Sequence, residues 1–137
     1  MQTYISREQD YALRIISALA ALPKETQLPV SRLSEQLHIS KNFAARIVYK
    51  LKTYGILSTT QGKHGGVSLK RNPSKLSVFE VLDTIGFKSK FNQCLDEKFH
   101  CEFSSKCMFH SYFEKEEEKF HNSMKSKMIS DFVIKNY

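Results

Sequence analysis

The first stretch of the chain with a clear hydrophobic period runs from Ser6 to Leu22. Its apolar residues recur mainly at steps of three and four, as on one face of a helix, and they are Tyr11, Ile15, Ala18, Leu19 and Leu22. Ser6 and Gln9 have the spacing of a capping box, in which each side chain satisfies a free backbone amide of the other residue. Pro23 stops the pattern, so we predict a helix over this range.

Two further helical patterns follow closely. The first is short and begins after Pro29, with Ser31 as its candidate N-cap, and its buried face would hold Val30, Leu33 and Leu37. Ser40 is the expected N-cap of a third helix that reaches Tyr54 and buries residues at steps of four, namely Phe43, Ile47 and Leu51. Two helices joined by a tight turn predict a helix-turn-helix, whose second helix enters the major groove of DNA by its N-terminal residues.

Two short strands are predicted next, over 56–60 and 67–70, from their content of apolar and β-branched residues. The turn between them, residues 61–66, is rich in glycine and basic, so its backbone can approach a sugar-phosphate chain closely. A strand pair at this place predicts a wing. A nucleotide-binding phosphate loop is the alternative, but that motif needs Gly-Lys-Ser/Thr at the start of a helix, whereas a strand follows here.

The second half of the chain contains a short and a long helical pattern. The short one runs from Ser77 to Gly86, and the long one begins near Met108 with a stripe formed by Phe109, Phe113, Phe120, Met124 and Met128. A long amphipathic helix needs a surface to cover its stripe, and a second copy of the chain is the expected one, with the chain's own head as the alternative. The expected fold is mainly α, a winged helix-turn-helix with a two-stranded wing and a long C-terminal dimerisation helix.

Basic residues are concentrated in the front of the chain. Residues 1–90 contain 14 Lys and Arg against 6 Asp and Glu, a charge of +8, whereas residues 91–137 contain 7 against 8, a charge of −1. A basic front implies an anionic partner, and double-stranded DNA fits the helix-turn-helix. The expected contacts come from the third helix and the wing tip, and a solvated basic face is the alternative; the residues are Ser40, Lys41, Asn42, Arg46, Lys50, Gln61, Lys63 and His64.

All three cysteines fall between the two last helical patterns, at Cys94, Cys101 and Cys107, with His110 close behind. The chain has no apolar run of about 20 residues and does not begin like a signal peptide, so we expect a cytoplasmic protein without membrane contact. In a reducing compartment, clustered cysteines favour metal or redox chemistry over a structural disulfide. An iron-sulfur cluster, a Cys3His zinc site and a reversible disulfide all remain open on chemistry alone. A cysteine-dependent enzyme is not expected, because no motif for an oxyanion site or a substrate pocket accompanies the His100-Cys101 pair.

The order of these parts resembles the Rrf-two family of bacterial winged-helix regulators. The likeness covers nearly the whole chain and rests on segments 10–14, 39–43, 51–55, 62–66 and 77–86, together with the three cysteines. The resemblance implies a homodimeric transcription factor that holds one iron-sulfur cluster per subunit, [2Fe-2S] or [4Fe-4S], through those cysteines. It also implies that nitric oxide, redox state or iron-sulfur status changes the binding of the operator.

The resemblance leaves two candidates for the fourth ligand of the cluster. IscR-like members carry a histidine with two residues between it and the third cysteine, which matches His110, and NsrR-like members use an aspartate from the other subunit, which matches Asp10. The sequence departs from the family pattern at Ala45, Gln61 and Gly86-Phe87, so the operator sequence stays open. The expected division is a DNA-binding head over 1–87, a cluster-binding loop over 88–107, and a dimerisation helix with its tail over 108–137.

Overall fold

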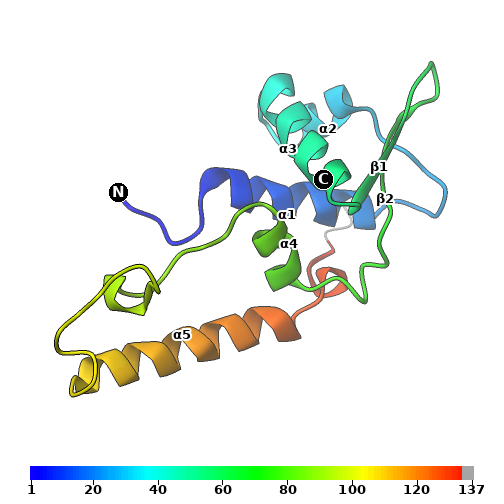
Figure 1. The fold of residues 1–137 in the computed structure, drawn as a ribbon. Coiled ribbons are helices and arrows are strands. Elements are labelled where there is room, and N and C mark those ends of the chain that lie inside the picture. Colours follow the sequence, from blue (N-terminus) through cyan, green and yellow to red (C-terminus); the bar gives the residue numbers. More distant parts are fainter. Residues whose placement is uncertain (134–137) are drawn as a thin grey trace.

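The computed structural model describes residues 1–133 of the chain. Its elements follow in the order α1 (Arg7–Ala20), α2 (Val30–Gln36), α3 (Lys41–Thr53), β1 (Leu57–Thr60), β2 (Gly66–Leu69), α4 (Val78–Thr84), the 3-10 helix η1 (Gln93–Leu95), α5 (Met108–Ser126) and the 3-10 helix η2 (Ile129–Phe132). The molecule is elongated, with the wing and the cysteine-bearing loop at opposite ends and α5 along one side (Figure 1). The predicted class, a mainly helical fold with a winged helix-turn-helix, is confirmed.

Local capping explains where three of the helices begin. The Ser6 hydroxyl accepts a hydrogen bond from the Gln9 amide while the Gln9 side chain accepts one from the Ser6 amide, which confirms the predicted capping box. The Ser40 hydroxyl accepts from the Phe43 amide at 3.1 Å, and the Ser77 hydroxyl accepts from the Glu80 amide at 3.0 Å. Each serine thus satisfies one of the backbone amides that a helix start leaves free.

The predicted cap at Ser31 is wrong. Pro29 occupies the N-cap position of α2 and makes no side-chain cap bond, so Ser31 lies inside the first turn, where its carbonyl accepts from the Ser34 hydroxyl at 2.8 Å. The backbone of Pro29 (φ −59°, ψ 145°) is extended, and Val30 is the first helical residue. A cap must precede the first helical residue, and the helix begins at Val30, two residues earlier than a cap at Ser31 requires.

One hydrophobic core joins the head. It collects buried side chains from α1, α2, α3, the wing and α4, among them Ile15, Ile16, Leu33, Ile47, Leu51, Leu57, Val67 and Val81. Burying each such side chain contributes about 1.5–3 kcal/mol relative to leaving it exposed. β1 and β2 pair antiparallel from Leu57↔Leu69 to Thr60↔Gly66, and a bridge from Leu28 to Val67 fastens the wing to the α1–α2 connection. Helix α3, the predicted recognition helix, and the wing therefore pack on the same hydrophobic core.

Gly65 lets the wing turn tightly. A Cβ atom at this position would lie 2.2 Å from the Thr60 carbonyl oxygen, far inside contact distance. We expect Gly65→Ala to force the turn open and lower the free energy of unfolding by about 1–3 kcal/mol, measured by urea denaturation. Gln61→Ala, at an exposed position of the same turn, is the control and should change this free energy by less than about 0.5 kcal/mol. Equal values for the two variants would contradict this reading of the turn.

The chain returns to the head after α5. Helix α5 ends at Ser126, Met128 pairs with Ser77 in an isolated bridge, and the Ile129 side chain is buried in the core of the head. The predicted apolar stripe is therefore only partly correct, because Met128 does not lie on the helix. In addition, Phe120 and Met124 pack against Leu82 and Phe87 of the same chain. The start of α5 differs, since Met108 and Phe109 are 87% and 72% exposed.

Candidate DNA interface and cysteine loop

The N-terminal part of α3 presents its polar residues to solvent. Ser40, Lys41, Asn42 and Arg46 are exposed there, and Tyr49 is exposed one turn later. A groove of about 290 Å³ separates this helix from the wing, and Ala45, Tyr49, Lys52, Thr60 and Gln61 are among the residues that line it. Lys63 and His64 are exposed at the tip of the wing. The residues expected to contact DNA thus include exposed side chains at the start of α3 and at the tip of the wing, the two parts by which a winged helix approaches a groove and its phosphates.

Glu8 of α1 binds two cations of the recognition helix. Its Oε1 lies 2.7 Å from the Lys50 Nζ and 3.7 Å from the Arg46 Nε, and the Glu8 side chain is 25% exposed. Charge-assisted contacts of this kind restrict where a lysine or arginine can reach. Two of the residues expected to contact DNA are therefore held by α1 in the free protein.

Cation–π contacts also position two arginine side chains beside the start of α3. The Arg7 guanidinium lies over the rings of Tyr11 and Phe43 at 5.2 and 5.8 Å, and the Arg46 guanidinium lies over Phe43 at 5.3 Å. Tyr11 and Phe43 meet edge to face at 5.8 Å, so α1 and α3 supply one shared aromatic platform. Guanidinium groups over aromatic faces are attracted by the ring quadrupole. Arg7 and Arg46 are thus both held over the Phe43 ring.

Replacing Glu8 with glutamine should strengthen non-specific DNA binding. The change removes the carboxylate charge that holds Lys50 and Arg46, so both cations become available to phosphates. We expect the slope of log affinity against log salt to steepen by about 1 for each of the two cations that gains a phosphate contact, because each such contact releases a further counterion. The measurement is fluorescence anisotropy on a random duplex at several salt concentrations. Glu118→Gln, an exposed site on α5, is the matched control, and equal slopes for the two variants would contradict the role of Glu8.

The cysteines lie in the loop between α4 and α5. Cys94 belongs to η1, Cys101 lies in the irregular part, and Cys107 is the N-cap residue of α5; all three are partly buried and none forms a disulfide. A hollow of about 440 Å³ beside the loop is lined by Cys94, Cys101, His100 and His110 among others, but not by Cys107. The His110 Nδ1 atom is buried and has no hydrogen-bond partner. Two of the three cysteines and His110 thus line the same space.

The metal donors are not gathered into a closed set. Within residues 1–133, no three His, Cys, Asp or Glu side chains converge as a metal ion would require. Asp10 lies in the first turn of α1, where its Oδ2 is 3.1 Å from the Arg14 Nε, and it does not line the cysteine hollow. Within one chain, then, His110 is near two of the cysteines and Asp10 is not.

The segment that enters the cysteine loop is fastened on both sides. The buried Glu117 of α5 accepts hydrogen bonds from the Lys90 Nζ at 3.1 Å and from the Phe91 amide at 2.9 Å. The Tyr4 hydroxyl donates to the Ser89 carbonyl at 3.2 Å, and the Ser89 hydroxyl donates to the Tyr4 carbonyl at 2.8 Å. Burial first, and then the Glu117 carboxylate, raise the pKa of Tyr4.

Residues 5–135 match the family model of Rrf2, described as an iron-dependent transcriptional regulator. The chain belongs to the Rrf2 family. The predicted resemblance is thus confirmed, and with it the expectation of a DNA-binding transcriptional regulator and not an enzyme. Within the part of this Rrf2 protein that the structure describes, no helix is long and apolar enough to span a membrane.

Two sequence relatives carry regulator names. A protein of Aquifex aeolicus classed as an HTH-type transcriptional regulator is 26% identical over 125 residues, covering 90% of this chain and 86% of the relative. The HTH-type transcriptional regulator NsrR of Bacillus licheniformis is 28% identical over 99 residues, covering 72% of this chain and 69% of the relative.

Two solved structures share the fold of this Rrf2 protein. IscR of T. potens superposes with a TM-score of 0.74 at 19% identity, covering 94% of this chain and 85% of that one. CymR of B. subtilis, named as the global cysteine regulator, superposes with a TM-score of 0.73 at 16% identity, covering 97% of both chains. At these identities the likeness establishes the architecture alone.

Sequence reasoning missed several residues that organise this Rrf2 protein. Glu117 lay within the charged run 114–119, although its spacing from Phe113 and Phe120 places it on the buried face of α5. Glu8 carried no local signal, because its partners Arg46 and Lys50 are about 40 residues away. Ion pairs between distant helices depend on packing, which a local pattern does not contain.

Proposed function

We propose that this Rrf2 protein is a homodimeric bacterial regulator whose operator binding is controlled by an iron-sulfur cluster held by Cys94, Cys101 and Cys107. The observation that carries the proposal is the hollow beside the cysteine loop, which Cys94, Cys101 and His110 line, together with the His110 Nδ1 atom, which is buried and has no hydrogen-bond partner. A buried polar atom without a partner calls for an explanation, and a missing ligand is one. The family description, an iron-dependent regulator, supports the same reading.

The donors suit such a cluster in kind. Thiolates are the usual ligands of iron-sulfur centres, and imidazole replaces some of them in known centres. When bound, the cluster would supply iron that can change oxidation state or react with nitric oxide. Cys107 would join the other two cysteines as a ligand, and because it is the N-cap residue of α5, its engagement acts directly on the start of that helix.

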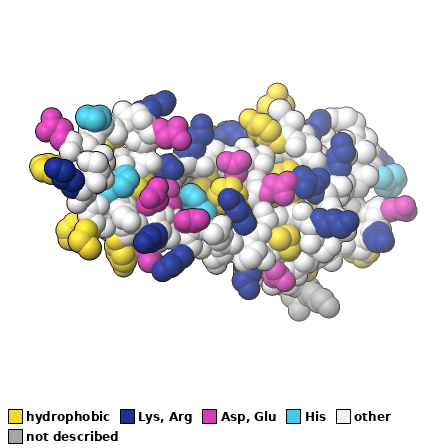
Figure 2. Space-filling model, turned by 60° about the horizontal axis from the view of Figure 1, so that its bottom comes forward, with side chains coloured by type: hydrophobic (Ala, Val, Ile, Leu, Met, Phe, Trp, Pro, Cys, Tyr) yellow, Lys and Arg dark blue, Asp and Glu magenta, His cyan; other side chains and the backbone are white. Residues whose placement is uncertain are grey.

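The homodimer is proposed from the exposed start of α5. Large apolar side chains gather at this end of the molecule (Figure 2), and those most exposed are Phe103, Met108, Phe109 and Tyr112. Exposed apolar groups of this size mark interaction surfaces, and symmetric pairing is the commonest way to cover them. A dimer would present two recognition helices to successive major grooves, and the cysteine loop beside the interface could alter their spacing.

The test is anaerobic reconstitution of the full-length protein with iron and sulfide. We expect a brown protein with visible absorbance whose affinity for its operator changes when nitric oxide is added. A change of about 5- to 150-fold is the usual range for coupling between two sites. A colourless protein that binds stoichiometric zinc and ignores iron, sulfide and nitric oxide would overturn the cluster proposal.

The fourth ligand is tested by comparing two variants. His110 borders the cysteine hollow and Asp10 does not, so we expect His110→Ala to change the visible spectrum and Asp10→Ala to leave it unaltered. His100→Ala, which removes another histidine of the same hollow, is the matched control. A spectral change with Asp10→Ala alone would instead assign the ligand to the partner subunit's helix, and no change with either would exclude both residues.

Thiol or zinc chemistry on the same cysteines is the second candidate. Its support is that all three thiols are unpaired and that the described residues do not already form a closed metal site. A reversible disulfide between Cys101 and Cys107 would then carry the signal. Mass spectrometry of metal-free protein treated with an added oxidant such as hydrogen peroxide distinguishes the two, because forming the disulfide transfers two hydrogen atoms from the thiols to the oxidant and lowers the mass accordingly. A site that acts only by binding zinc leaves all three thiols reduced and the mass of the metal-free chain unchanged.

A further inference from the structure

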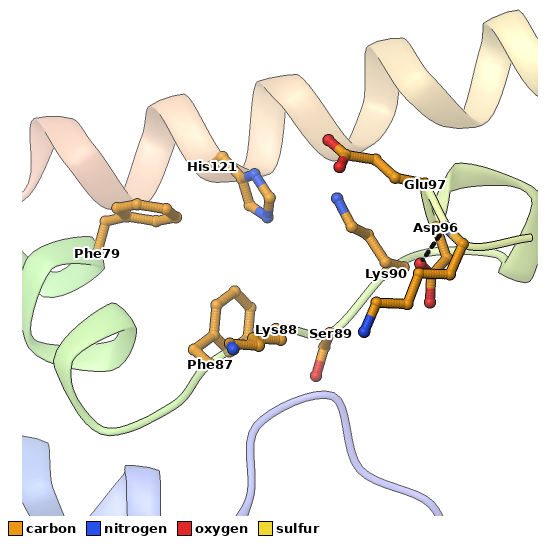
Figure 3. Close-up of a pocket in the computed structure, with 9 residues that line it drawn as sticks. Phe79, Phe87, Lys88, Ser89, Lys90, Asp96, Glu97 and His121 are labelled. Atoms are coloured by element: carbon orange, nitrogen blue, oxygen red, sulfur yellow. Dashed lines mark hydrogen bonds between the residues drawn. The ribbon is translucent and has the colours of Figure 1, made fainter.

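A second hollow, of about 400 Å³, lies between α4, the segment that follows it and α5. Figure 3 shows Phe79 and Phe87 on one side, with Lys88 beside Phe87, His121 projecting from α5, and Asp96 and Glu97 on the other side. None of the three cysteines lines this space. It is therefore distinct from the proposed cluster site, although the segment 90–97 borders both.

The inner wall of this hollow holds an unsatisfied polar atom. The Nε2 of His121 is buried and has no hydrogen-bond partner, while the imidazole ring packs against Phe79 at 5.3 Å and Phe87 at 6.0 Å. Burying a polar atom without a partner is unfavourable, so such atoms usually meet a ligand or an ordered water. The two phenylalanine rings give the same wall a flat apolar surface.

The opening of the hollow carries charges of both signs that have no ion-pair partner. Among the described residues, Lys88, Lys98 and Glu97 form no salt bridge, whereas the Lys90 ammonium is already bound by Glu117. Asp96 uses its Oδ1 to accept the Lys98 amide at 2.9 Å. Two free ammonium groups and a free carboxylate therefore stand beside an apolar, aromatic wall.

We propose that this hollow binds a small zwitterion, chemically an α-amino acid with an apolar or aromatic side chain. Its carboxylate would meet Lys88 and Lys98, its ammonium group would meet Glu97, and its side chain would lie along Phe79 and Phe87. The His121 Nε2 would gain a polar partner. The proposal does not rest on the iron-sulfur cluster, so the two can fail separately.

L-phenylalanine is the probe, tested against the full-length protein by isothermal titration calorimetry and by NMR of the histidine side chains. We expect saturable binding with a dissociation constant on the order of 1 mM and a shift of the His121 imidazole resonances. 3-Phenylpropionate lacks the ammonium group and phenethylamine lacks the carboxylate. Each should bind about tenfold more weakly than L-phenylalanine, because each leaves charged groups of the hollow unpaired.

Variants locate the site. His121→Phe keeps the aromatic packing but removes the Nε2 atom, and Lys88→Gln changes an exposed residue that the fold does not need. Both should weaken L-phenylalanine binding severalfold, whereas Lys115→Gln, an exposed lysine of α5 outside the hollow, should not. Absence of a saturable His121 shift up to about 10 mM L-phenylalanine, well above the millimolar range of weak sites, would overturn the proposal. Equal binding of all three probes, or binding unaffected by Lys88→Gln, would overturn it as well.

Discussion

Replacing Cys101 with alanine should leave the anaerobically reconstituted protein colourless. Cys101 is one of the two cysteines that line the hollow together with His110, so its loss leaves too few donors for an iron-sulfur cluster. We expect the visible absorbance to disappear. We also expect operator affinity to become the same before and after treatment with iron and sulfide, which removes a coupling of about 1–3 kcal/mol. Absorbance spectra and fluorescence anisotropy on the operator measure the two effects.

Ser105→Ala is the matched control for that substitution. Ser105 is an exposed residue of the same loop and does not line the hollow, so its replacement should preserve both the absorbance and the response. Both variants should unfold at the same temperature when no metal is present. A Cys101→Ala protein that still becomes brown and still responds would contradict the assignment of this cysteine.

Replacing Phe109 with aspartate should convert the protein to a monomer. The Phe109 side chain is 72% exposed at the start of α5 and stacks with Phe113 at 6.3 Å, so it stands in the centre of the proposed interface. A carboxylate placed there would be buried without a partner in the dimer, which is strongly unfavourable. A monomer contacts one half-site only, and operator affinity should fall by about 100-fold or more as the second contact is lost.

Sedimentation velocity and operator titration measure these outcomes together. Asn122→Asp introduces the same negative charge at an exposed position in the C-terminal half of the same helix, and it should leave both the mass and the affinity unchanged. Because Phe109 is exposed in a single chain, its variant should keep the thermal stability of an isolated subunit. A Phe109→Asp protein that remains dimeric would move the interface to another surface.

Local signals in the sequence predicted the fold well. The predicted caps at Ser6 and Ser40 depend on a side chain and an amide three residues away, so spacing alone identifies them. The apolar faces of α1 and α3 were predicted for the same reason. The predicted cap at Ser31 was wrong because Pro29, which has no side-chain group that can cap a helix, supplies the extended residue that precedes α2.

Long-range arrangements could not be predicted in the same way. The stripe of α5 was extended to Met128 because a period does not state where a helix ends, and here the chain leaves the helix to pair with Ser77. Cysteine spacing placed three thiols in one loop but did not state that Cys94 and Cys101 share a hollow while Cys107 begins α5. The positions of the three cysteines depend on how the loop folds against α5. That folding involves the hydrogen bond from the Phe91 amide to the Glu117 carboxylate, which joins residues 26 positions apart.

The return of the chain after α5 anchors the C-terminal end of that helix to the head. Its C-terminal end is held by Met124 in the core, by the bridge from Met128 to Ser77 and by the buried Ile129. Its other end, about 28 Å away for 19 residues at 1.5 Å each, carries Cys107 and the exposed apolar side chains. A small rotation of α5 about its anchored C-terminal end therefore displaces Cys107 and the apolar side chains at its start by a much larger distance. A change at Cys107 would in turn act on the packing of α5 against the head.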